Sequence, residues 1–481
     1  MSAPLGLIPW PTAVEPRGGE VPLAAVRVVS PDPSRWPALA AELLGPLGVV
    51  VGTAPCDGGV SAVAVELRLE ASGAGDESYT LDVRDDGVTV TAPGEVGLLH
   101  GLRTLRQLVT PRLTAPTVVV RDAPRYRWRG LTLDVARHWF GPATLRRVVD
   151  LAGAYKLRLL HLHLTDDQGW RIAVPSHPEL TERSGVTQVG GRVPPGERGW
   201  LTAAEFRELQ EYAAVRFVEI VPEIDVPGHT NAATHACGAL LPDGEPTPAY
   251  GGIDVGFSRL WADNPATAPW MRDVLGDVAA MTVGRYVHVG GDEALTLEAE
   301  EYARLVRIAV EAVRAAGKTP VAWQEAAAAE VGPGAVLQYW DPRTDAAPFA
   351  RAAAAGARFV VSPAPHAYLD LKYDAAHPIG QDWIGHVDLR DTYDWEPAQA
   401  VPGVAPEAVE GVAAALWTET IATDADLFSM LLPRLPALAE VAWTAPAGRD
   451  WDAFRERIAP HARVWDAEGW AYHPTRQVDW P

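Results

Sequence analysis

The residues best suited to chemistry are acids, tryptophans and a few bases that follow short apolar runs in residues 125–481. They are Arg137, His138, Asp166, Asp167, Glu223, Asp225, His229, Asp292, Glu293, Trp323, Glu325, Trp340, Asp341, Tyr368, Asp370, Trp417 and Glu419. The sequence contains no glycine-rich phosphate loop, no Gly-x-Ser-x-Gly motif and no Cys-His pair. Indoles pack on the apolar faces of pyranose rings, and carboxylates and arginines bind their hydroxyls. This combination indicates a carbohydrate ligand.

Two adjacent acids, Asp292 and Glu293, close the run His288-Val-Gly-Gly-Asp-Glu293. A nucleophile and an acid that straddle a sugar ring lie ~5 to 5.5 Å apart, and sequence neighbours are poorly placed for this. The pair instead suits a long Glu293 that reaches the glycosidic oxygen while the shorter Asp292 supports a group at C2. The structural alternative is an acidic pair at a helix N-terminus, where carboxylates favour the helix dipole.

Eight short apolar runs alternate with helical segments after Pro124, which is typical of βα units around a parallel sheet. The expected strands are residues 130–134, 157–164, 217–221, 286–289, 319–322, 336–339, 359–362 and 412–416. Active sites of such barrels lie at the carboxyl ends of the strands, where the polar and aromatic residues above stand. The sequence therefore predicts an α/β fold, with a catalytic (β/α)8 TIM barrel over residues 125–481.

Residues 1–124 are predicted to form a separate, small α+β domain without a catalytic role. Alternating runs at 61–69, 79–83 and 88–91 predict strands, and Asp85-Asp86-Gly87 predicts a hairpin turn. Leucines and valines recur at helical spacing over 94–109, before an extended run at 117–120. We expect a structural or docking role for this domain.

Three segments carry a family resemblance. The segments His161-Leu-His-Leu-Thr-Asp-Asp-Gln-Gly-Trp-Arg171, Val221-Pro-Glu-Ile-Asp-Val-Pro-Gly-His229 and His288-Val-Gly-Gly-Asp-Glu293 resemble the central motifs of the family 20 glycoside hydrolases, the β-N-acetylhexosaminidases. Ile8-Pro-Trp-Pro-Thr resembles the opening of that family's N-terminal domain, so the resemblance extends along nearly the whole chain. It implies an exo-acting hydrolase that removes terminal non-reducing N-acetylglucosamine or N-acetylgalactosamine with retention of configuration, without a cofactor or a metal.

The resemblance also implies a role for each site residue. The 2-acetamido oxygen of the substrate attacks C1 and forms an oxazolinium ion, in a substrate-assisted mechanism. Asp292 accepts the amide N–H, Tyr368 steadies the carbonyl, and Glu293 protonates the leaving oxygen and then activates water. Asp166 and His229 orient Glu293. The remaining expected residues bind the substrate. The acetamido methyl is surrounded by Trp323, Trp340 and Trp417, and the ring hydroxyls are bound by Arg137, Asp370 and Glu419.

Several of these residues have ordinary structural alternatives. His229 follows Pro-Gly and can simply cap a loop, Arg137 can be an ion-pair partner, and any single indole is more often core than platform. His161 and His163 are expected to be histidines of the barrel core. Asp167 and Asp225 are expected to be struts or helix caps.

Two other functions are compatible with parts of the pattern. A metal-dependent amidohydrolase is suggested by His161-x-His163 on one strand face, but it requires further histidines at later strand ends, where Trp323 and Trp340 stand instead. A sugar-binding protein without catalysis is the second alternative. The presence of Asp292, Glu293 and Tyr368 argues against it.

Composition excludes other partners. The 41 basic and 62 acidic residues give a net charge of −21, which disfavours nucleic acid and anionic membranes. Cys56 and Cys237 are far apart in sequence, so a disulfide framework or a cage of thiolates is not expected. The first residues lack a basic stretch followed by an apolar run, so we expect a cytoplasmic protein, or a secreted one if the chain is a trimmed form. The preferred C4 epimer, the aglycone and the oligomeric state stay open.

Overall fold

A computed structural model describes residues 5–52, 62–70, 73 and 75–481. Cys56 and Ser61 lie outside the described residues. The chain divides into two compact units. The first comprises Met1–Tyr126, Ala154–Lys156 and Leu431–Pro481, and the second comprises Arg127–Gly153 and Leu157–Met430.

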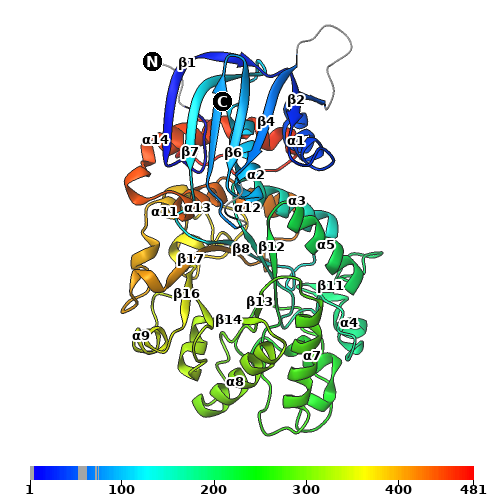
Figure 1. Cartoon of the computed structure of the whole chain (residues 1–481). Coiled ribbons are helices and arrows are strands. Elements are labelled where there is room, and N and C mark those ends of the chain that lie inside the picture. Colours follow the sequence, from blue (N-terminus) through cyan, green and yellow to red (C-terminus); the bar gives the residue numbers. More distant parts are fainter. Residues whose placement is uncertain (1–4, 53–61, 71–72, 74) are drawn as a thin grey trace. The chain divides into compact units, whose positions relative to one another are not determined.

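The second unit is a closed barrel of eight parallel strands, which confirms the predicted TIM barrel (Figure 1). In chain order the strands are β8 (Trp128–Asp134), β9 (Leu159–His163), β12 (Glu219–Glu223), β13 (Tyr286–His288), β14 (Thr319–Trp323), β15 (Val336–Tyr339), β16 (Arg358–Val361) and β17 (Val409–Leu416). The barrel closes where β17 pairs with β8, for example with Ala413 opposite Gly130. Each of these strands overlaps one predicted from its apolar run.

Helices cover the outside of the barrel (Figure 1). The helices of this unit are α3 (Pro142–Ala154), α4 (Glu179–Ser184), α5 (Ala203–Val215), α6 (Asn231–Ala236), α7 (Thr267–Met281), α8 (Ala299–Ala315), α9 (Ala347–Ala354), α10 (Ala364–Ala367), α11 (Leu389–Tyr393) and α12 (Asp424–Leu431). The predicted capping box of α5 is present, because the Thr202 side chain accepts from the Glu205 backbone and the Glu205 side chain accepts from Thr202. Two long excursions, one after β9 and one after β12, carry α4 and α6.

The first unit contains a seven-stranded sheet with the order β1-β7-β5-β6-β4-β2-β3. The strands are β1 (Ala13–Pro22), β2 (Ala25–Val29), β3 (Val50–Gly52), β4 (Val63–Leu69), β5 (Tyr79–Arg84), β6 (Gly87–Ala92) and β7 (Thr114–Asp122). The predicted hairpin is β5–β6, paired from Thr80 opposite Thr91 to Arg84 opposite Gly87. The predicted helix is α2 (Glu95–Leu108), and α1 (Trp36–Leu44) is a second helix in this part of the chain.

The last 51 residues depart from the predicted domain extent. Residues 125–481 were assigned to the barrel, but Leu431–Pro481 group with the first unit. Their helices are α13 (Arg434–Trp443), α14 (Trp451–Ile458) and α15 (Ala462–Glu468). Glu440 binds Arg457 at 2.6 and 2.8 Å and accepts from the Trp10 backbone at 2.9 Å. Helical periodicity reveals a buried face but not the partner of that face, so the sequence pattern could not assign these helices.

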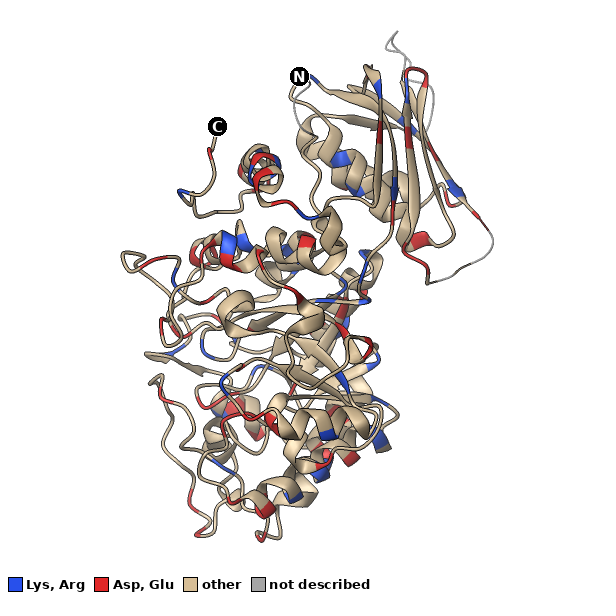
Figure 2. Ribbon diagram, turned by 90° about the vertical axis from the view of Figure 1, so that its left-hand side faces the viewer, with Lys and Arg blue, Asp and Glu red and all other residues tan. Residues whose placement is uncertain are grey.

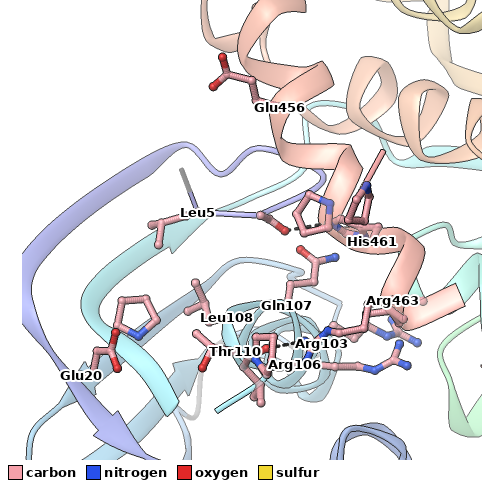
Figure 3. A pocket seen from close by; sticks show the side chains of 18 of the residues that line it. Leu5, Glu20, Arg103, Arg106, Gln107, Leu108, Thr110, Glu456, His461 and Arg463 are labelled. Carbon is pink, nitrogen blue, oxygen red and sulfur yellow. Dashed lines mark hydrogen bonds between the residues drawn. The ribbon is translucent and has the colours of Figure 1, made fainter. Parts of the chain in front are cut away.

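A cavity of about 1000 Å³ lies within the first unit, between α2, β1 and α15 (Figure 3). Arg103, Arg106 and Arg463 line it together with apolar side chains. Arg106 forms an ion pair with Glu468, and Nη2 of Arg463 donates to the Val109 carbonyl at 2.9 Å. These arginines therefore hold the walls of the first unit together.

Acidic and basic positions are interspersed on the helices and loops of the barrel unit (Figure 2). Among the described residues, none of the helices combines the length and the apolarity that crossing a bilayer requires.

Candidate active site

The predicted site residues gather around one cavity at the carboxyl ends of the barrel strands. The cavity has a volume of about 390 Å³. Its lining includes eight of the eleven predicted residues: Arg137, Asp292, Glu293, Trp340, Tyr368, Asp370, Trp417 and Glu419. Asp166, His229 and Trp323 are not part of this lining. A volume of this size accommodates one sugar ring with its substituents.

Aromatic side chains form much of the cavity wall. The ring of Trp340 stacks on Tyr368 at 6.0 Å and 15°, and Trp417 lies 6.2 Å from Tyr368. The Trp323 ring lies 5.7 Å from Trp417, and its Nε1 donates to Oε1 of Glu223 at 2.8 Å. Trp323 is 1% exposed, so it packs with the other aromatic residues behind the wall rather than facing the opening.

The backbone after β13 places Asp292 and Glu293 in the cavity. Gly290 and Gly291 have φ angles of +70° and +105°, and Glu293 itself has a φ of +45°. The left-handed region costs a residue with a Cβ about 1–2 kcal/mol, and such strain is concentrated at functional sites. The Gly291 N–H donates to Oδ1 of Asp225 at 3.0 Å, and the Gly291 carbonyl accepts from the Tyr302 hydroxyl at 2.6 Å. This segment is a fixed turn and not the first turn of a helix, which removes the structural alternative for the acidic pair.

A carboxylate oxygen of Asp292 lies within 4.8 Å of a carboxyl oxygen of the buried Asp225. Burial and the charge of Asp292 raise the pKa of Asp225 well above its usual value, so Asp225 holds the proton of this pair. Burial and the charges of Glu293 and Glu223 also raise the pKa of Asp292, although His229 opposes this. Asp225 was expected to be a structural or helix-capping residue, and the structure places its carboxyl group beside Asp292.

Tyr368 faces the same acids. Burial and the charge of Asp292 raise the pKa of the Tyr368 phenol well above its usual value. The phenol therefore remains a hydrogen-bond donor at all physiological pH values. It is placed to donate to an oxygen atom in the cavity.

Asp166 and His229 connect to Glu293 from behind the cavity. Nδ1 of His229 lies 3.2 Å from Oδ1 of Asp166, and Nε2 of His229 lies 3.5 Å from Oε2 of Glu293. Burial lowers the pKa of His229, but the charges of Asp166 and Asp292 outweigh it and raise the pKa well above its usual value. His229 has a φ of +52°, a second strained position at the site. It is an imidazolium that contacts the candidate acid, not a loop cap.

The same chain of contacts continues into the barrel. Oδ2 of Asp166 lies 2.8 Å from Nε2 of His163, and Nδ1 of His163 lies 2.7 Å from Oε2 of Glu223. Burial raises the pKa of Asp166, but Arg137 and His229 outweigh it and hold the pKa well below its usual range. Acids and imidazoles thus alternate from Glu223 to Glu293.

Arg137 joins this chain to the cavity floor. Its Nη2 lies 2.8 Å from Oδ2 of Asp166 and 4.0 Å from Oε1 of Glu419, and its guanidinium lies over the Trp417 ring at 5.1 Å. Burial raises the pKa of Glu419, and Arg137 opposes this. Asp370 is 1% exposed and also lines the cavity. Arg137 therefore forms ion pairs, as its structural alternative supposed, and also faces the ligand space.

His161 and His163 belong to the barrel core, as predicted. The Glu223 carboxylate lies within 3.0 Å of nitrogen atoms from four side chains: His161 Nε2, His163 Nδ1, His288 Nδ1 and Trp323 Nε1. Nε1 of Trp323 donates to Oε1 of Glu223, and Nδ1 of His288 accepts from the Gly290 N–H at 3.0 Å. The histidines therefore surround a buried carboxylate inside the barrel, away from the cavity lining.

Four further cavity residues, and Glu325 beside the cavity, were given no role from the sequence. Trp383 and Arg343 line the opening, as do Ile253 and Val255 from the excursion after β12. Glu325 accepts from Nε1 of Trp340 at 3.2 Å, and burial and the charge of Asp292 raise its pKa to about 8. Loop residues such as Ile253 have no periodic signal, whereas Glu325 was visible as an acid that directly follows a strand.

A parallel α/β barrel with an aromatic-walled, carboxylate-lined cavity at its strand ends defines a class of protein, the barrel glycoside hydrolases. Comparison with known proteins gives the family. The family model described as glycosyl hydrolase family 20, catalytic domain, matches residues 126–446, and the model for domain 2 of that family matches residues 5–123. The chain belongs to glycosyl hydrolase family 20.

Individual relatives are similar to this chain along nearly its whole length. A β-N-acetylhexosaminidase of Cellulomonas fimi is 51% identical over 488 residues, which covers 99% of this chain and 97% of the relative. A β-hexosaminidase of Vibrio furnissii is 32% identical and covers 91% of this chain and 76% of the relative. The structure of Streptomyces plicatus N-acetyl-β-hexosaminidase in complex with Thio-NAglucal superposes with a TM-score of 0.92 at 40% identity, covering 100% of this chain and 99% of the other.

Proposed function

We propose that this chain is an exo-acting β-N-acetylhexosaminidase that removes terminal non-reducing N-acetylglucosamine or N-acetylgalactosamine from a glycan by a retaining, substrate-assisted mechanism. The observation that carries the proposal is the position of Asp292, Glu293 and Tyr368 around one cavity lined by Trp340 and Trp417. The acids are sequence neighbours on one turn, which suits an acid and a supporting group rather than two carboxyls across a ring.

The first step uses the substrate's own acetamido group. Its carbonyl oxygen attacks C1, the bond from C1 to the leaving oxygen breaks, and Glu293 gives its proton to that oxygen. Asp292 accepts the acetamido N–H and offsets the positive charge of the oxazolinium ion. Tyr368 donates to the acetamido oxygen, and Trp340 and Trp417 confine the methyl group so that the attack has a high effective molarity.

The second step reverses the proton transfer. Glu293 takes a proton from water, the hydroxyl adds to C1 from the face that the leaving group vacated, and the acetamido group re-forms. The imidazolium of His229 stabilises the Glu293 carboxylate between the two steps. Arg137, Asp370 and Glu419 bind the ring hydroxyls.

A substrate pair with the same leaving group tests this mechanism. We expect a nitrophenyl β-glucoside, which lacks the acetamido group, to react more than about 10³-fold more slowly than the N-acetylglucosaminide, because the internal nucleophile is lost. Comparable rates, or a glycosyl ester on a side chain trapped and found by mass spectrometry, would refute substrate assistance. The same assay with the galacto epimer identifies the preferred C4 configuration.

A further inference from the structure

Three side chains that prefer divalent metals meet outside the active-site cavity. His177 stands in the excursion after β9, Glu179 is the first residue of α4, and Cys237 follows α6 in the excursion after β12. Each position is fixed by the backbone, since the His177 N–H donates to the Val174 carbonyl at 3.0 Å and the Cys237 N–H donates to the Ala233 carbonyl at 2.8 Å. A nitrogen, an oxygen and a sulfur donor are therefore held together by two separate parts of the chain.

The distances suit a tetrahedral ion. Oε1 of Glu179 lies 3.1 Å from Nδ1 of His177 and 3.2 Å from Sγ of Cys237, and the three donor atoms lie within 4.8 Å of one another. Around Zn²⁺ the edges between such ligands are about 3.3–3.6 Å, which follows from Zn–N, Zn–O and Zn–S bonds of about 2.0–2.3 Å. Side-chain rotations that close the remaining separation, of up to 4.8 Å, would bring the donors to these lengths.

A buried indole lies next to the three donors, since the Trp270 ring is 6.3 Å from the His177 ring. The indole of Trp270 is 4% exposed, and its Nε1 atom has no hydrogen-bond partner among the described residues. Nε2 of His177 lies 3.8 Å from Oδ2 of Asp273, so a carboxylate stands near the far nitrogen of this imidazole.

We propose that His177, Glu179 and Cys237 form a structural Zn²⁺ site, with water as the fourth ligand. Solvent reaches it, because the side chains of His177 and Glu179 are 21% and 38% exposed. On binding, the Cys237 thiol loses its proton to solvent, and the Zn–S bond replaces the hydrogen bond to Glu179. A single thiolate with imidazole and carboxylate is not the multi-cysteine cage that the two distant cysteines exclude.

The ion would join the two excursions that supply the active site. The excursion after β9 carries Asp166, and the excursion after β12 carries His229. Nδ1 of His229 lies 3.2 Å from Oδ1 of Asp166, and this pair orients Glu293 in the proposed mechanism. A cross-link between them stabilises the folded chain and takes no part in the chemical steps. The proposal is thus independent of the catalytic mechanism.

Co²⁺ replaces Zn²⁺ in such sites and reports a thiolate ligand by a charge-transfer band. We expect the full-length, chelator-stripped protein to bind one Co²⁺ with this band, and one Zn²⁺ per chain to displace it. Cys237→Ser should abolish the band and weaken Zn²⁺ binding at least about 100-fold, and His177→Gln should weaken it at least about 10-fold. Cys56→Ser, the matched control, should behave as the unmodified chain.

The absence of a thiolate band in the unmodified chain, or its persistence in Cys237→Ser, would overturn the proposal. A second measurement does not depend on the folding of Cys237→Ser. In the Cys56→Ser chain, Cys237 is the one remaining thiol, and Zn²⁺ should slow its alkylation at least about 10-fold. An equal alkylation rate with and without Zn²⁺ contradicts a Cys237–metal bond.

Discussion

His229 holds its Nε2 atom 3.5 Å from Oε2 of Glu293. Because its other ring nitrogen faces Asp166, the charge of this buried imidazole is maintained by a carboxylate that does not line the cavity. In the proposed mechanism, Glu293 therefore gains and loses its proton beside a fixed positive charge.

Asp166→Asn is expected to remove the main charge that raises the pKa of His229. His229 should then lose its proton at a lower pH. We expect kcat/KM at neutral pH to fall by about 10- to 100-fold, which is less than the fall caused by replacing the general acid Glu293. A raised imidazole pKa contributes stability that is fully present below pH 6.5 and is lost as the pH rises through the folded-state pKa, so the variant should lose this contribution at a lower pH. The kcat/KM profile against pH and an NMR titration of His229 measure these effects.

Asp150→Asn provides a matched control, because Asp150 pairs with Arg216 at 2.5 Å outside the cavity. Its kcat/KM profile should follow that of the unmodified enzyme. An Asp166→Asn profile that also follows it would show that Asp166 does not act through His229.

Glu293→Gln is expected to separate substrates by their leaving groups. Without a general acid, an alkoxide must leave unprotonated, so kcat for a disaccharide should fall by about 10² to 10⁴-fold. A dinitrophenyl glycoside needs little protonation, and its first step should be much less affected. Steady-state and burst kinetics on the two substrates test this, and equal losses on both would exclude the acid role.

Gly290→Ala is expected to impair both stability and activity. At φ +70° an added Cβ would overlap the Asp225 carboxyl, which accepts from the Gly291 N–H and lies beside Asp292. The variant should lose about 1–2 kcal/mol from backbone strain and about 1–3 kcal/mol more from the overlap. Chemical denaturation and kcat measure the two effects.

Gly317→Ala is the control for strain alone, because Gly317 has a φ of +76° and nothing within 4 Å of the added Cβ. It should lose about 1–2 kcal/mol without a change in kcat. If Gly290→Ala behaves in the same way, the close approach to Asp225 has no catalytic importance.

Glu325→Gln is expected to reduce the loss of stability that accompanies a rise in pH from 5 to 8. The folded chain keeps a proton on Glu325 up to about pH 8, whereas an unfolded Glu loses it near 4.5. The folded state binds more protons in this interval, so this group lowers the free energy of unfolding as the pH rises. The amide can still accept from Trp340, and the decline from pH 5 to 8 should be smaller by about 1 kcal/mol or more.

Denaturation at several pH values measures this difference, with Glu208→Gln as an exposed control that should leave the decline unchanged. A decline in Glu325→Gln equal to that of the unmodified chain would indicate that Glu325 is already ionised at neutral pH.

The barrel and most of the cavity lining could be predicted from the sequence. Strand β15 was predicted to the residue, because a buried strand between two helices appears as a short apolar run. Asp292 and Glu293 were recognised because strand ends of a barrel converge on one face, so position along the chain already indicates position in space. Location in the cell and oligomeric state stay predictions or open questions.

The tertiary structure alone decided which side chains touch. Asp225 becomes the proton-bearing partner of Asp292, Trp323 packs behind the cavity, and α13 to α15 join the first unit. Periodicity along one segment records how much of each face is buried, but not what covers it. Charge states such as those of Asp225 and His229 depend on burial and on neighbours more than sixty residues away, and those distances are set only when the barrel closes.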